Sequence, residues 1–209
     1  MNESSKAHWE NVYDNKKENE VSWYQQHPKT SLEFVNSCKL DKDAFIIDVG
    51  GGDSRLVDTL LEKGYQNTWV LDISAKAIDR AKKRLGEKAG RVHWVVSDIT
   101  EFEAPVKFNF WHDRAAFHFL TRQEEIEKYI SVATASVAAN GYMLLGTFSE
   151  NGPLKCSGLE IHQYSEETLT KTWKDSFRKL NCIYQDHITP FNTKQNFLFC
   201  CFQKKLVNE

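Results

Sequence analysis

The stretch Phe45-Ile46-Ile47-Asp48-Val49-Gly50-Gly51-Gly52-Asp53-Ser54-Arg55 decides the fold of this chain. Its apolar start, residues 45–47, has the continuous hydrophobicity of a parallel strand that is buried on both faces. Three glycines follow, and residues 56–61 then have helical spacing. Glycine adopts positive φ without a steric clash and lets a ligand approach the backbone. The stretch therefore predicts a strand, a tight turn and a helix whose free N–H groups face a ligand.

The residues around the turn narrow the choice of ligand. A dinucleotide site has the pattern G-x-G-x-x-G; here Gly50 and Gly52 fit it, but Arg55 stands at the last glycine position. Asp48 lies two residues before Gly50, where a carboxylate would repel a diphosphate and could hold a cation. S-adenosylmethionine carries an ammonium and a sulfonium group and no phosphate, so the turn favours this ligand.

Two more carboxylates end apolar runs further along the chain. Asp72 closes the run 69–72, and an acid at its distance from the turn accepts hydrogen bonds from the two hydroxyls of a ribose. Asp98 closes the run 95–98, where it could contact an adenine edge. Aspartate also caps helices at such places, and for Asp98 in particular this alternative stays open.

The segments D-V-G-G-G-D-S, V-L-D-I-S and V-S-D-I-T resemble the cofactor motifs of class I, Rossmann-like S-adenosylmethionine-dependent methyltransferases. The resemblance extends over roughly residues 9–204, is close to uncharacterised bacterial members, and departs from the family pattern at Ser54, where a third glycine is usual. It implies that the cofactor contacts Asp48, Gly50, Gly51, Gly52, Asp72, Ile73, Asp98, Ile99 and Trp111.

The composition indicates the broad class of protein. The chain has 209 residues and a net charge of −2, with both signs of charge mixed throughout, which suits one domain. We expect a single domain over 1–209, and the resemblance implies an N-terminal helical lid at 1–40 and a Rossmann-like core at 41–205. The lack of a basic stripe argues against nucleic-acid binding. The sequence shows no membrane-spanning run, and residues 1–6 do not resemble a signal peptide.

Five cysteines occur without the spacing of a metal site. We therefore expect free thiols in a reducing cytoplasm, and no metal. Cys200 and Cys201 are adjacent and should point to opposite faces of a strand. We also expect a monomer or a weak homodimer.

Strands and helices alternate over most of the chain, which predicts a doubly wound α/β fold with a mostly parallel sheet. Two final strands around the polar loop 190–194 predict an antiparallel C-terminal edge hairpin. The resemblance implies seven strands, with helices on both faces. Expected helices are 5–17, 30–38, 54–63, 75–88, 122–139 and 165–178; expected strands are 45–47, 68–72, 91–96, 106–112, 142–148, 180–187 and 196–203.

The methyl acceptor should lie at the carboxyl end of the fourth strand, where strand order reverses in such sheets. Segment 108–119 brings ionisable and aromatic groups to this junction. His112 is the candidate general base because its side chain titrates near neutrality. Asp113 could orient His112 or hold a substrate amine. A structural His112 bonded to the backbone remains the alternative.

Aromatic residues mark the predicted lid. Trp9 and Tyr13 share one face of the helix at 5–17. Trp23 and Tyr24 follow in a polar neighbourhood and are expected to contact the substrate, although they could simply pack the segment against the domain.

Two further residues are expected to line the acceptor pocket. Arg114 follows the fourth strand, where it could instead pair with a nearby acid. Cys156 lies in a long, glycine-containing loop after the fifth strand, as binding residues often do. A nucleophilic Cys156 with His162 as its base lacks a third partner, so we expect Cys156 to line the pocket only.

The leading hypothesis is methyl transfer from S-adenosylmethionine to a small-molecule acceptor by in-line displacement. The alternatives are a protein-lysine methyltransferase, a non-catalytic S-adenosylmethionine-binding protein and a nicotinamide-dependent oxidoreductase. An aromatic lid favours an enclosed site for a small molecule, whereas a protein acceptor would favour an open, acid-lined cleft.

Overall fold

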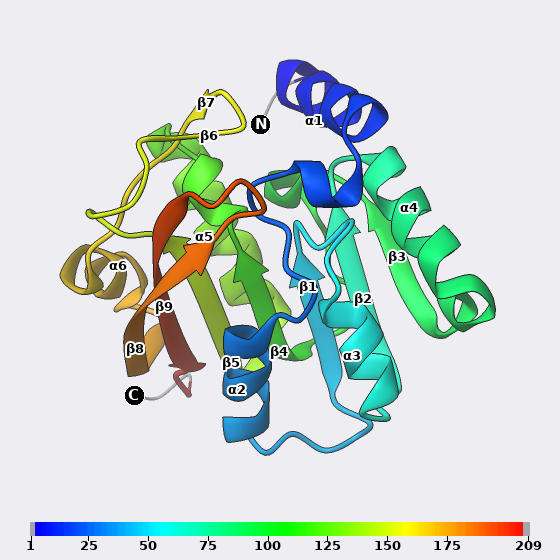
Figure 1. Ribbon diagram of the computed structural model, residues 1–209. Helices are drawn as coiled ribbons and strands as arrows, with labels where there is room; N and C mark the ends of the chain where they lie inside the picture. Colours follow the sequence, from blue (N-terminus) through cyan, green and yellow to red (C-terminus); the bar gives the residue numbers. More distant parts are fainter. Residues whose placement is uncertain (1–2, 207–209) are drawn as a thin grey trace.

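The chain folds around a seven-stranded sheet with the strand order β3-β2-β1-β4-β5-β9-β8 (Figure 1). The computed structural model describes residues 3–206, so the predicted range 1–209 extends beyond it at both ends. Strands β1 to β5 are parallel, and β9 is antiparallel to β5 and β8. The strands are β1 Phe45–Val49, β2 Asn67–Asp72, β3 Val92–Val96, β4 Phe108–Arg114, β5 Val137–Phe148, β8 Phe177–Ile188 and β9 Lys194–Lys204, with a separate hairpin of β6 Lys155–Cys156 and β7 Leu159–Glu160.

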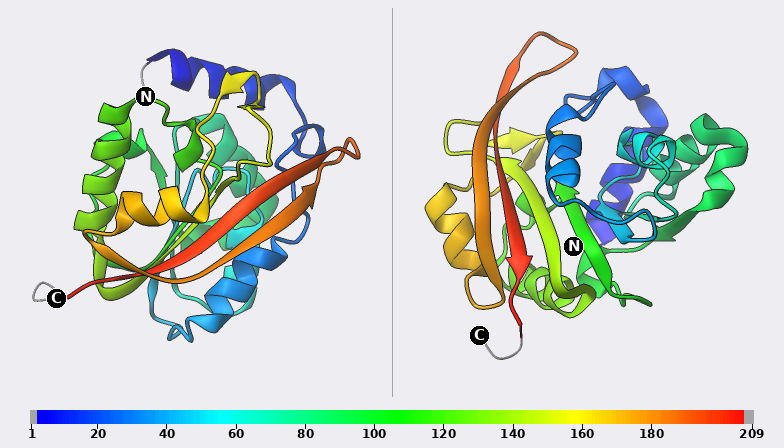
Figure 2. Two further views of the ribbon diagram at one scale, coloured as in Figure 1. Left: turned by 90° about the vertical axis from the view of Figure 1, so that its left-hand side faces the viewer. Right: turned by 90° about the horizontal axis from the view of Figure 1, so that it is seen from below.

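Helices cover both faces of this sheet (Figure 2). One face carries α2 and α3, which bury Leu32 and Leu60, and α4, which buries Leu85. The other face carries α5 and α6, which bury Tyr129 and Trp173. The α-helices are α1 Glu3–Asn15, α2 Lys29–Ser37, α3 Leu56–Glu62, α4 Ala75–Leu85, α5 Gln123–Ser136 and α6 Glu166–Trp173; the short 3₁₀ helices are η1 Glu18–Glu20, η2 Gly86–Arg91, η3 Ile99–Glu101 and η4 Phe117–Phe119.

The predicted fold class is confirmed, down to the antiparallel edge hairpin. Strand order reverses between β1 and β4, so the carboxyl ends of these strands form the crevice in which ligands bind in open α/β sheets. Within residues 3–206, none of the helices has the length and apolar character needed to cross a membrane.

The predicted helix 122–139 is too long. Helix α5 ends at Ser136, and β5 begins at the next residue, Val137. Val137 already pairs with Phe108 of β4, and the register shifts before Phe110, so sheet pairing takes the chain out of the helix early. Asn140, the residue after the predicted helix, lies within β5 with a φ of +58°, as in a bulge.

The prediction of free thiols is wrong for one pair of cysteines. Cys182 of β8 and Cys200 of β9 stand opposite each other in the sheet and form a disulfide. Cys38, Cys156 and Cys201 are free thiols. Cys200 and Cys201 face opposite sides of the sheet, as predicted, since they belong to different core clusters.

Helix α1 lies beside the carboxyl edge of the sheet, whereas α2 packs on one of its faces (Figure 1). Helix α1 docks on α4 through Glu10, whose carboxylate accepts hydrogen bonds from the Ala75 N–H at 2.8 Å and the Ser74 hydroxyl at 3.2 Å. A carboxylate at the start of a helix is also favoured by the helix dipole. Glu10 thereby holds α1 beside the crevice.

Candidate cofactor and acceptor site

The glycine turn after β1 closes against the end of β2. Gly50 has a φ of +66°, and the N–H groups of Gly50 and Gly51 donate to the Leu71 carbonyl at 2.8 and 3.2 Å. A Cβ atom on Gly51 would overlap the Asp48 carboxylate. The turn therefore requires glycine both for its backbone angle and for the space that Asp48 occupies.

Asp72 is a buried carboxylate at the end of β2. Its Oδ2 accepts a hydrogen bond from the Gly52 N–H at 3.0 Å, and its Oδ1 accepts one from the Ser74 N–H at 2.8 Å. Burial raises the pKa of this carboxyl to about 6, although the two hydrogen bonds act in the opposite direction. Each oxygen keeps a lone pair, so the ionised group can accept further hydrogen bonds from a diol.

Asp48 belongs to a buried chain of three polar side chains. His112 Nδ1 lies 2.6 Å from Asp48 Oδ1, and His112 Nε2 lies 2.8 Å from Ser31 Oγ of α2. Asp48 and His112 are paired on β1 and β4, so their side chains leave the same face of the sheet. Within residues 3–206, Asp48 Oδ2 has no hydrogen-bond partner. One anionic oxygen is thus left for a ligand.

Asp113 and Trp111 point to the opposite face from His112, because successive residues of a strand alternate. Asp113 accepts hydrogen bonds from the Tyr129 hydroxyl at 2.5 Å and from backbone N–H groups of the following turn, and burial raises its pKa to about 6. Trp111 Nε1 donates to the same hydroxyl at 3.0 Å. The prediction that Asp113 orients His112 is therefore wrong, and Asp48 has that role.

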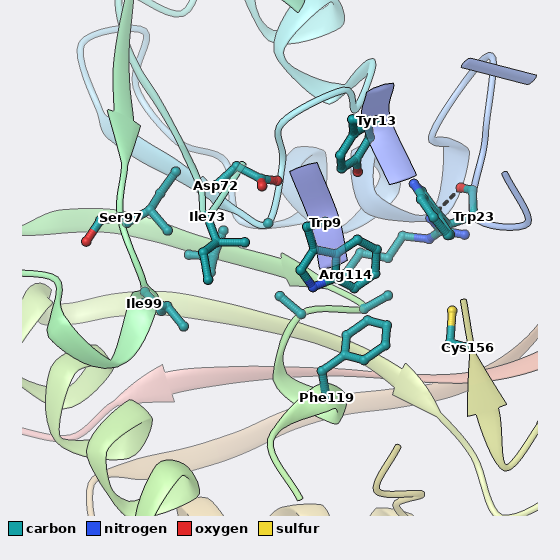
Figure 3. Close-up of a pocket in the computed structure, with 15 residues that line it drawn as sticks. Trp9, Tyr13, Trp23, Asp72, Ile73, Ser97, Ile99, Arg114, Phe119 and Cys156 are labelled. Atoms are coloured by element: carbon teal, nitrogen blue, oxygen red, sulfur yellow. Dashed lines mark hydrogen bonds between the residues drawn. The ribbon is translucent and has the colours of Figure 1, made fainter. Parts of the chain in front are cut away.

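Two adjoining cavities lie at the crevice. The first, of about 80 Å³, is called the Asp72 cavity; Figure 3 shows Asp72 and Ile73 at one end and Cys156 at the other. The second, of about 50 Å³, is called the Asp48 cavity. The Asp72 cavity is lined by Trp9, Tyr13, Trp23, Val49, Gly50, Leu71, Asp72, Ile73, Ser97, Ile99, Arg114, Ala115, Ala116, Phe119 and Cys156. The Asp48 cavity is lined by Tyr13, Glu18, Val21, Trp23, Tyr24, Gln25, Pro28, Ser31, Asp48, Gly50, Asp53, Ser54, Arg55, His112 and Arg114.

These cavities bring together most of the residues predicted from the sequence. The predicted residues that line them are Asp48, Gly50, Asp72, Ile73, Ile99, His112, Trp23, Tyr24, Arg114 and Cys156. Among the described residues, Trp111 and Asp113 lie instead in the core beside α5, and Gly51 and Gly52 form the turn itself.

Asp98 lies outside both cavities. Its Oδ1 accepts hydrogen bonds from the Thr100 N–H at 2.9 Å and the Thr100 hydroxyl at 2.8 Å, so it caps η3. Of the two roles left open for Asp98, the structure shows the capping role. Its neighbours Ser97 and Ile99 line the Asp72 cavity instead.

An aromatic wall encloses the Asp72 cavity. The Trp9 ring centroid lies 5.0 Å from that of Phe119 and 5.6 Å from that of Trp23, both edge to face. Tyr13 and Phe119 were not among the predicted site residues. The shared face of Trp9 and Tyr13 was a usable signal for Tyr13. Phe119 follows a turn at Ala115, where φ is +72°, and no pattern in the sequence indicated it.

Arg84 of α4 holds the far end of the glycine turn. Its guanidinium donates to Asp53 Oδ1 at 2.8 Å, to the Ser54 carbonyl at 2.7 Å and to both Asp58 carboxylate oxygens at 3.0 and 2.9 Å. These bonds connect α4, the turn and α3. The turn therefore keeps its shape through contacts within the protein, without the need for a bound ligand.

The known proteins that resemble this chain include methyltransferases. Residues 46–141 match a family model described as a methyltransferase domain. The mouse (Mus musculus) eEF1A lysine and N-terminal methyltransferase is 26% identical over 124 residues, which is 58% of this chain and 18% of the mouse protein. This chain thus matches a small part of that relative.

Solved structures share the fold over nearly the whole chain. An S-adenosylmethionine-dependent methyltransferase from Anabaena variabilis has a TM-score of 0.75 at 13% identity, covering 98% of this chain and 96% of that one. The 1,6-didemethyltoxoflavin-N1-methyltransferase of Burkholderia thailandensis, with bound 1,6-didemethyltoxoflavin and S-adenosylhomocysteine, has a TM-score of 0.67 at 17% identity, covering 97% and 85%. These likenesses show that the whole chain has the fold of S-adenosylmethionine-dependent methyltransferases, and residues 46–141 carry the sequence match to a methyltransferase domain.

Proposed function

We propose that this protein transfers a methyl group from S-adenosylmethionine to a small-molecule acceptor. We infer a small acceptor because Trp9, Trp23 and Phe119 enclose the Asp72 cavity. Enclosed, largely apolar cavities with a few polar groups suit small ligands, whereas a protein side chain is presented from a surface groove. The Burkholderia thailandensis enzyme, which binds 1,6-didemethyltoxoflavin, supports this acceptor class.

The residues of the two cavities fit the cofactor. The unpartnered Asp48 Oδ2 would accept hydrogen bonds from its ammonium group, and Asp72 would accept them from its ribose hydroxyls. Ile73 and Ile99 would offer apolar surface to the adenine at the Asp72 end of this cavity. When bound, the cofactor supplies an electrophilic methyl carbon on a sulfonium.

In this proposal the protein acts by positioning and by excluding water. Both ring nitrogens of His112 are bonded and the residue is 2% exposed, so it holds the Asp48 carboxylate in place instead of accepting a proton from the acceptor. Asp113 likewise holds the Tyr129 hydroxyl and the turn after β4. Alignment alone lowers the barrier by about 7–11 kcal/mol in ideal intramolecular reactions. An acceptor that arrives deprotonated needs no base.

Release of S-adenosylhomocysteine tests the proposal. The protein is incubated with methyl-labelled S-adenosylmethionine and either a panel of small amines, thiols, heterocycles and carboxylates or a protein extract. We expect the label in a small molecule. The Asp48→Asn variant, which removes a charge from the cofactor site, should transfer less label.

Label confined to protein side chains would instead support the lysine alternative, which the mouse relative favours. Tight S-adenosylhomocysteine binding without turnover on either panel would support a non-catalytic binding protein. Tight NAD binding would overturn the assignment of the cofactor.

A further inference from the structure

Arg114, the last residue of β4, is a half-buried cation, and none of residues 3–206 offers it a carboxylate partner. Its Nη1 donates to the Trp23 carbonyl at 2.9 Å, and its guanidinium lies 4.8 Å from the centre of the Phe197 ring. Within residues 3–206, its Nε and Nη2 are buried and have no hydrogen-bond partner. Burial lowers the pKa of this guanidinium to about 10. A buried charge left in this way is unfavourable unless an anion compensates it.

The position of Arg114 links the cofactor cavities to a third cavity. This cavity, of about 210 Å³, lies between α2 and the β8–β9 hairpin and is called the His187 cavity. Of the described residues, Arg114 alone lines all three cavities. Phe197 and Phe199 give the His187 cavity an apolar wall. A ligand that reaches Arg114 from this side lies next to the cofactor site.

The acidic groups near Arg114 have other partners. Glu33 and Asp186, which also line the His187 cavity, pair with Lys29 and Lys194. Asp48 is bonded to His112, and its other oxygen is suited to the cofactor's ammonium group. Burial raises the pKa of the Cys156 thiol to about 11, so this residue is uncharged near neutrality. The compensating anion is therefore expected from a ligand.

We propose that the methyl acceptor is a small molecule that has an apolar body and a carboxylate, and that Arg114 binds this carboxylate. This inference rests on the proposed function. Nε and Nη2 form one edge of the guanidinium and present two parallel N–H donors. This edge matches a carboxylate in a bidentate arrangement. The apolar body would lie against the aromatic rings that surround Arg114.

The competing assignment is that Arg114 binds the carboxylate of the cofactor itself. The two assignments predict different losses of binding affinity when Arg114 is substituted. If Arg114 serves the acceptor, its substitution leaves S-adenosylhomocysteine affinity unchanged. If it serves the cofactor, S-adenosylhomocysteine loses affinity while 5′-methylthioadenosine, which has no carboxylate, does not.

Calorimetry on the protein saturated with S-adenosylhomocysteine tests the proposal with benzoate and hexanoate, each against its neutral amide. We expect the carboxylates to bind about tenfold more tightly than the amides, as a charged hydrogen bond implies. Arg114→Met should remove this preference, Arg114→Lys should keep part of it, and Arg91→Met, at an exposed arginine, should leave it intact.

Equal binding of carboxylates and amides to the wild type, no binding of either, or a preference that survives in Arg114→Met would overturn the proposal. Loss of S-adenosylhomocysteine affinity in Arg114→Met would assign Arg114 to the cofactor. A wild type that fails to bind S-adenosylhomocysteine would contradict the proposed function itself, so the two failures are distinguishable.

Discussion

His112 Nδ1 lies 2.6 Å from Asp48 Oδ1, across the boundary between β1 and β4 where strand order reverses. The other ring nitrogen, Nε2, lies 2.8 Å from Oγ of Ser31, which belongs to α2. In the proposed function, the oxygen that Asp48 would offer to the cofactor therefore depends on a histidine from another strand. Three elements meet in this one chain of hydrogen bonds.

We expect His112→Leu to weaken S-adenosylhomocysteine binding more than His112→Asn does. Asparagine keeps a donor that can face Asp48, whereas leucine leaves a buried carboxylate oxygen unpaired. A hydrogen bond to a charged group contributes about 1.5–3 kcal/mol, or about ten- to a hundredfold in Kd. Calorimetry measures this loss. Intact binding in both variants, with turnover abolished, would show instead that His112 is the general base.

Asp72→Ala should weaken binding of S-adenosylhomocysteine by at least about 1.5–3 kcal/mol, the contribution of one charge-assisted hydrogen bond. The physical reason is the loss of the carboxylate expected to accept the ribose hydroxyls. The control is Asp79→Ala, an exposed aspartate on α4, which should bind normally. Unchanged affinity in a folded Asp72→Ala protein would remove Asp72 from the site.

Gly51→Ala should reduce cofactor affinity without unfolding the protein. The added Cβ would overlap the Asp48 carboxylate, which must then leave its place beside His112. Gly90→Ala is the matched control, because a Cβ there meets no atom within 4 Å. Calorimetry and thermal unfolding separate the two effects. Wild-type affinity in Gly51→Ala would mean that the position of Asp48 does not govern binding.

Asp113 should make stability depend on pH. Burial raises its pKa from 3.8 to about 6, so the folded protein holds the proton more tightly than the unfolded chain. The free energy of unfolding then falls as pH rises from about 4 to 6, by on the order of 3 kcal/mol from this group. Asp113→Asn, which keeps an acceptor for the backbone N–H groups, should reduce the slope of that part of the profile and leave the contribution of Asp72, whose pKa is also about 6.

Urea unfolding of Asp113→Asn, the wild type and Asp79→Asn across this pH range measures the effect. Asp79→Asn should follow the wild-type profile. A wild-type slope in the Asp113→Asn profile would show that the carboxyl is ionised normally in the folded state.

The sequence predicted the fold well because its information is local. The apolar run of β1, the glycines after it and the terminal acid of β2 lie close together in the chain. Asp98 shows the limit of this reasoning. It also follows an apolar run, yet Thr100, two residues away, offers both a backbone and a hydroxyl donor, and this local partner decides its orientation.

Contacts between distant residues could not be predicted in the same way. Asp48 and His112 are 64 residues apart and meet because of the β1–β4 register, while Asp113, next to His112, faces away. Strand alternation was readable from the sequence, but the register that selects a face was not. The same holds for the disulfide between Cys182 and Cys200, which depends on how β8 pairs with β9.

The network around Arg84 has a consequence for the speed of cofactor exchange. Because Arg84 joins the glycine turn to α3 and α4, the entropy of ordering this loop is lost when the chain folds and not at each binding event. In the proposed function, the turn is therefore ordered before the cofactor binds, and the exchange of one cofactor molecule for the next does not require it to fold again.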